Sequence, residues 1–198
     1  MPVTRSAPPS DADDAVQAAL RHFATVPDAN LHALRGTRPA ELAPTVPHPV
    51  FHLGLDALMA GAPALSSTRS TGWRYLLSQD DEVVASAETV ADAAGGARFS
   101  HFNSGPFVAS TSAALAAAEG LSEVEDGSFD LRLLHVPALH AMALWLHGDG
   151  DNDLLIPLAP SPAGVEANRA YPASELLGIL AGQAGEIPRM EPGDTRGG

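Results

Sequence analysis

The chain has 198 residues, 45% of them hydrophobic and 5% aromatic, and its 24 acidic residues against 11 basic ones give a net charge of −13. This length fits one domain with a substantial core. The negative charge disfavours nucleic acid and anionic membranes as partners, because both require a positive surface. The chain has no Cys and no Lys, which excludes disulfides, thiolate metal sites, cysteine nucleophiles, Schiff bases and P-loop lysines.

The basic residues are all arginines, and the excess negative charge lies in the second part of the chain. Residues 1–78 carry six arginines and six acidic residues, whereas residues 79–198 carry five arginines and eighteen acidic residues. Arginine without lysine, together with abundant Ala, Gly and Pro, is typical of GC-rich, bacterial-like coding. The charge distribution predicts a protein partner that presents a basic surface.

The N-terminal part of the chain is expected to lie outside the main domain. Residues 1–9 contain three prolines and are predicted to be disordered, and a helix is predicted over 11–25, with Ser10 and Asp13 forming a capping box. Four prolines follow within 36–49, and this density predicts an extended connector that is neither helix nor central strand. The first ten residues lack an apolar stretch, so we expect a soluble, cytoplasmic protein.

The middle of the chain predicts a helix over 50–60, a β-hairpin and a second helix. Residues 73–77 and 83–88 alternate apolar and polar side chains on either side of a turn at 79–81. A third strand is expected over 98–102. Ala-rich residues 112–119 predict a helix that Ser110 or Thr111 caps and Gly120 ends.

A second block of alternating residues predicts three more strands, over 129–133, 142–147 and 154–158. Tyr171 and Pro172 are expected to open a final helix with Leu176, Leu177 and Leu180 facing inward. The predicted fold is α+β, with an antiparallel sheet of about five to six strands packed against helices on one face. The predicted organisation is a disordered start, helix and connector over 1–49, one domain over 50–184, and a disordered tail over 185–198.

Scattered histidines are the main candidates for catalysis. His135, His140 and His147 fall on or near adjacent predicted strands, where they can lie close together. With His101 and Asp149 they suggest a hydrolase-type enzyme, possibly metal-assisted, in which a histidine acts as general base. This enzyme is the alternative hypothesis, with His101, His135, His140 and Asp149 as its catalytic residues.

Two short motifs resemble metal sites, but neither is complete. His48 and His52 have the helical i, i+4 spacing of zinc ligands, yet no carboxylate completes the pattern. Asp149, Asp151 and Asp153 begin like a calcium loop, but the glycine and the glutamate that such a loop needs are missing. We therefore predict no metal and no cofactor.

The leading hypothesis is a non-enzymatic interaction or accessory module with an acidic binding face. Two acidic segments, one before the predicted meander and one between its last two strands, are expected to dock an Arg- or Lys-rich partner, and Trp145 is expected to be an exposed aromatic anchor. The oligomeric state stays open. The predicted binding residues are Glu123, Glu125, Asp126, Trp145, Asp149, Asp151 and Asp153.

Overall fold

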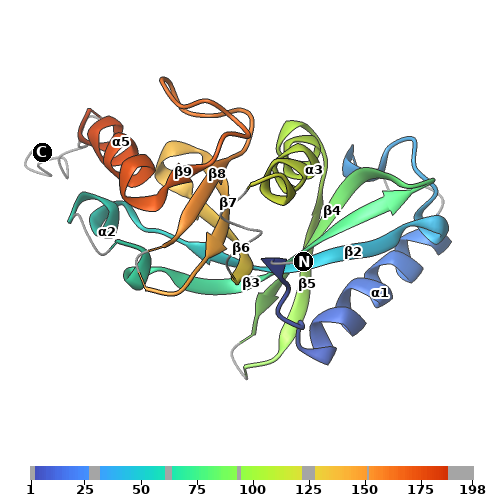
Figure 1. The fold of residues 1–198 in the computed structure, drawn as a ribbon. Coiled ribbons are helices and arrows are strands. Elements are labelled where there is room, and N and C mark those ends of the chain that lie inside the picture. Colours follow the sequence, from blue (N-terminus) through green and yellow to red (C-terminus); the bar gives the residue numbers. More distant parts are fainter. Residues whose placement is uncertain are drawn as a thin grey trace, which may run out of the picture.

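The computed structural model describes residues 3–26, 32–60, 64–92, 95–121, 128–150 and 152–186. In this part of the chain the fold is α+β: one mixed nine-stranded sheet, mostly antiparallel, with four helices packed on it (Figure 1). The expected fold class is therefore confirmed, whereas the sheet has more strands than the five to six expected. None of the described helices is long and apolar enough to cross a membrane.

The strands follow the spatial order β5-β4-β3-β2-β6-β7-β8-β9, and β1 pairs with β6. The sheet is mixed because β1 and β2 both run parallel to β6, whereas all other neighbours are antiparallel. The strands are β1 (Val3–Thr4), β2 (Ala43–His52), β3 (Arg69–Gln79), β4 (Glu82–Ala91), β5 (Ala97–Asn103), β6 (Phe129–Val136), β7 (Ala141–His147), β8 (Leu154–Pro157) and β9 (Tyr171–Pro172).

Helices pack on both faces of the sheet, not on one face as expected. The helices are α1 (Ser10–Thr25), α2 (Leu55–Met59), α3 (Pro106–Glu119) and α5 (Ala173–Gly185). Leu133 belongs to the apolar cluster under α3, whereas its neighbour Leu134 belongs to the cluster under α2 and α5. Successive residues of a strand point to opposite faces, so α3 and α5 cover opposite sides of the sheet.

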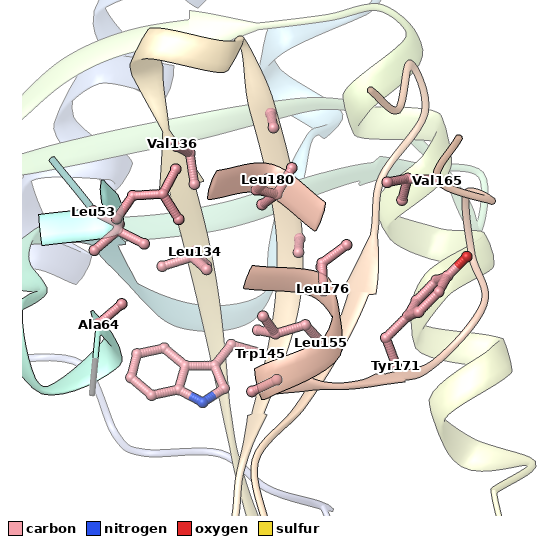
Figure 2. Packing of buried hydrophobic residues seen from close by; sticks show 14 of the residues in the cluster. Leu53, Ala64, Leu134, Val136, Trp145, Leu155, Val165, Tyr171, Leu176 and Leu180 are labelled. Carbon is pink, nitrogen blue, oxygen red and sulfur yellow. The ribbon is translucent and has the colours of Figure 1, made fainter. Parts of the chain in front are cut away.

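The apolar core consists of three clusters, and each belongs to one helix or helix pair. Helix α1 covers β3, β4 and β5 through Val16 and Leu20, and α3 covers the middle of the sheet. The third cluster joins α2 and α5 to β6, β7 and β8, with Leu176, Leu180 and the indole of Trp145 at its centre (Figure 2). In Figure 1, α1 and α5 lie at the two ends of the molecule and α3 lies between them.

Several predicted elements are confirmed. Helix α1, the hairpin of β3 and β4, the third strand β5 and the meander of β6, β7 and β8 all occur where the sequence pattern placed them. The hairpin turn has Asp80 and Asp81 at positive φ (53° and 65°), as expected for a tight turn whose backbone twist matches the strands. Leu176 and Leu180 of α5 are buried.

The expected connector over 36–49 is wrong, because residues 43–52 form β2 in the middle of the sheet. The strand tolerates Pro44, Pro47 and Pro49 because β2 pairs with β6 only from Val50 to His52. Over the proline-rich part, β2 has a registered partner strand on one side only, and that strand is β3. The missing backbone N–H groups of the prolines therefore cost little stability. A register shift between Thr45 and His48 also falls here, where Val46 has a φ of 46°.

Two helix starts and one helix cap differ from the prediction. The helix expected over 50–60 shortens to α2, because its first three residues finish β2. Helix α3 begins at Pro106, so Ser110 and Thr111 lie inside it, and Gly120 ends it as predicted. Ser10 makes no side-chain cap on α1; instead Asp11 accepts a hydrogen bond from the Ala97 amide at 2.6 Å, which ties α1 to β5. The predicted tail beyond residue 186 lies outside the described residues.

Gly72 allows β3 and β4 to approach closely, and it yields the first prediction. Its φ is 157°, and a Cβ added there would lie 1.8 Å from the carbonyl oxygen of Thr89. Gly72→Ala should therefore lower the free energy of unfolding by about 2 to 3 kcal/mol. Gly178→Ala, in α5 with open space around the added methyl, should raise it by about 0.5 to 1 kcal/mol. Urea denaturation measures both changes, and equal effects would contradict the proposed close contact.

Candidate functional site

One face of the sheet carries a row of polar side chains beside α3, and we call it the histidine face. Cross-strand register places His101, Glu88, Arg74 and His48 opposite one another across β5, β4, β3 and β2. The same register places His52, His135 and Met142 opposite one another across β2, β6 and β7. With Asn103, the histidine face consists of His48, His52, Arg74, Glu88, His101, Asn103, His135 and Met142.

A buried ion pair lies at the centre of the histidine face. The Arg74 side chain is 3% exposed, and its Nε donates to Glu88 Oε1 at 2.9 Å. Asn103 Nδ2 donates to the same oxygen at 3.2 Å, and His101 Nε2 lies 3.9 Å from Oε2. Burial raises the pKa of Glu88, but the charge and hydrogen bonds of Arg74 outweigh burial and lower it overall. Glu88 is therefore a fixed carboxylate and not a mobile base.

His52 and His135 contact each other across the parallel β2–β6 pair. His52 Nε2 and His135 Nδ1 are 3.2 Å apart, so one nitrogen donates a hydrogen bond to the other. The rings meet edge to face, with their centroids 4.8 Å apart. Burial, followed by the neighbouring His52, lowers the pKa of His135 to about 4. The His135 imidazole is therefore neutral at pH 7, and it is a potential ligand or base rather than a cation.

His48 is fully buried, and its ring is held in one tautomer. Its Nδ1 donates to the carbonyl oxygen of Val46 at 2.7 Å. Burial, followed by the charge of Arg74, lowers the pKa of His48 from 6.5 to about 4. Protonation therefore requires a second positive charge beside Arg74 in the interior, which the folded state resists.

The second prediction concerns acid sensitivity. The folded pKa of His48 lies below its unfolded value, so its contribution to stability is complete above pH 6.5 and is lost as the pH falls toward 4. The size of the shift corresponds to roughly 3 kcal/mol over that interval. His48→Leu should flatten the decline of unfolding free energy between pH 7 and 4, measured by urea titration at each pH. His22→Gln, at an exposed position, should leave the decline unchanged; a wild-type slope in His48→Leu would contradict the prediction.

The histidine face contains two of the four residues of the predicted catalytic set. His101 and His135 both belong to the cross-strand rows of this face, and His101 Nε2 lies 3.9 Å from Glu88 Oε2. His140 lies in the turn before β7, with a φ of 48°, whereas Asp149 is exposed in the turn after β7. His140 and Asp149 therefore lie at opposite ends of one strand. His147 pairs elsewhere, with its Nδ1 2.8 Å from Asp153 Oδ1.

The expected exposed anchor, Trp145, is buried, which corrects that prediction. It lies in the apolar cluster under α5 (Figure 2). It is 3% exposed and packs edge to face against Phe51, with the Arg132 guanidinium 4.8 Å from its ring centroid. Its place in β7, opposite Arg132 of β6, turns the indole into the cluster under α5. Trp145 therefore stabilises the core and offers no surface to a partner.

The predicted acidic docking residues have mixed placements. Asp153 accepts hydrogen bonds from His147 and from the Gly148 amide, so it orders the turn between β7 and β8. Asp149 is exposed. Glu123, Glu125, Asp126 and Asp151 lie outside the described residues, and their role in docking stays a prediction.

Among the described residues, no group of three or more His, Asp or Glu side chains is arranged to hold a metal. The i, i+4 spacing of His48 and His52 does not place them on one helical face, because both residues lie on β2. His48 bonds to Val46, whereas His52 meets His135. Sequence spacing could not identify this partner, which is 83 positions away along the chain.

A pocket between α1 and β2 is a second feature that the sequence analysis missed. It has a volume of about 350 Å³. At its floor, Tyr75 is 2% exposed; burial, followed by the nearby carboxylate of Asp13, raises the pKa of its phenol. Asp13, Val16 and Gln17 are spaced so that they share one face of a helix. Only the tertiary fold places prolines opposite that face. The α1–β2 pocket is lined by Pro8, Asp13, Val16, Gln17, Pro44, Pro47 and Tyr75.

Comparison of the chain with protein-family models, with curated proteins and with solved structures yields no match in any of the three.

Proposed function

We propose that the protein is an interaction module that binds a basic segment of a partner protein, and that the α1–β2 pocket receives an Arg or Lys side chain of that segment. The observation that carries the proposal is the combination of shape and charge in this pocket. Its described lining contains one carboxylate, Asp13, and no basic residue.

The chemistry of the lining suits a long cationic side chain. A guanidinium or ammonium group can donate charge-assisted hydrogen bonds to Asp13 and a further bond to the amide oxygen of Gln17. The aliphatic stem of the ligand can pack on the apolar wall formed by Pro44 and Pro47. Arginine fits this combination best, because its planar group forms two parallel bonds with one carboxylate.

The net charge of −13 supports the same proposal at longer range. An acidic molecule attracts a basic partner and speeds encounter, although this field adds little affinity by itself. Glu123, Glu125 and Asp126 are proposed as part of this attracting surface, with Asp149 and Asp151. In this arrangement the acidic segments steer the partner and the pocket supplies the specific contact.

The third prediction is that the pocket binds a fluorescent hexaarginine peptide. Fluorescence anisotropy measures the binding affinity at low and at high salt. Asp13→Asn preserves the shape of the side chain and removes its charge, so it should weaken binding about tenfold, the value of one charge-assisted hydrogen bond. Glu175→Gln is the matched control, because Glu175 also lies in the first turn of a helix and is exposed. It should change affinity less than about twofold.

The outcomes separate the pocket from the acidic surface. The Asp13→Asn variant could bind like wild type while binding is lost when Glu123, Glu125 and Asp126 become glutamines. That result would place the contact in the acidic segment and overturn the proposed role of the pocket. If Asp13→Asn and Glu175→Gln lose the same affinity, the effect comes from net charge and not from the pocket. Hexaarginine binding no better than hexaglutamate would overturn the proposed function itself.

A further inference from the structure

The contact between His52 and His135 plays no part in the proposed binding of a basic segment. The two residues are directly opposite in the parallel register of β2 and β6, so both imidazoles project from the same face of the sheet. Both residues are half-buried, which leaves the pair accessible from solvent. A nitrogen of each ring lies 3.2 Å from the other.

This separation matches that of two ligands on one metal ion. Zinc–imidazole bonds of 2.0 to 2.1 Å in tetrahedral geometry place two ligand nitrogens about 3.3 to 3.4 Å apart. We propose that His52 Nε2 and His135 Nδ1 together bind one divalent first-row transition-metal ion, of which Zn²⁺ and Cu²⁺ are favoured by imidazole ligands.

Metal binding requires one change of tautomer and no net transfer of protons to solvent. In the metal-free pair, one of the two facing nitrogens carries the hydrogen and donates it to the lone pair of the other. When the ion binds, the donor imidazole carries that proton on its other ring nitrogen instead. Both facing lone pairs then coordinate the metal, and each imidazole remains neutral.

Among the described residues around the pair, no third side chain is free to bind the ion, so the protein supplies two ligands. The carboxylate of Glu88 is engaged by Arg74 and Asn103, and the opposite charges of Glu88 and Arg74 compensate each other near the site. Met142 is the cross-strand neighbour of His135, but its Sδ lies 3.5 Å from Arg74 Nη2. The remaining coordination positions therefore belong to water or to an external ligand, as in open rather than closed zinc sites.

The fourth prediction is tested by isothermal titration calorimetry of the full chain with Zn²⁺. Wild type should bind one ion, and His52→Gln or His135→Gln should each weaken binding by at least about tenfold, because loss of even an outer-shell partner of a metal typically costs about that much. The double variant should show no saturable binding at this site. His147→Gln removes a competing imidazole beside Asp153, and His22→Gln removes an exposed one; both should bind like wild type.

A measurement on wild type keeps the proposal testable should either variant unfold. In ¹⁵N-histidine spectra, added Zn²⁺ should shift the ring resonances of two of the eight histidines, and these should be His52 and His135. Titration without saturable binding in wild type would overturn the proposal. Equal weakening by His147→Gln, or shifts confined to other histidines, would overturn it as well.

Discussion

The pairing of β2 with β6 over three residues, Val50 to His52, joins the two halves of this sheet. On one side β2 belongs to the antiparallel strands β3, β4 and β5, and on the other it meets the meander of β6, β7 and β8. Val50 packs in the cluster under α3, and Phe51 packs against the cluster under α5. This short parallel contact therefore connects two of the three apolar clusters directly.

Both candidate sites follow from the path of β2. Where β2 pairs with β6, it places His52 beside His135. Before that point β2 has its registered partner only in β3, and its prolines form one wall of the pocket against α1. A strand that paired with β6 along its whole length could not carry three prolines, so the pocket depends on the limited extent of this pairing.

Several polar atoms are buried on and beside the histidine face. His48 Nε2, Arg74 Nη1 and Ser86 Oγ are buried and lack a hydrogen-bond partner within the described part of the chain. A buried polar atom that stays without a hydrogen-bond partner typically costs about 1 to 3 kcal/mol. An apolar face would pack against α3 without this cost.

Sequence patterns alone determined the local elements and the charge of this protein. Periodicity predicted α1, the β3–β4 hairpin and the strands of the meander, because the alternation of buried and exposed side chains is a local property of each segment. Composition likewise established the net negative charge. Only the tertiary structure decided that residues 43–52 form a central strand, that Trp145 is buried, and that His52 meets His135. These outcomes depend on which distant strands pair and in which register, and single-sequence periodicity carries no information about either.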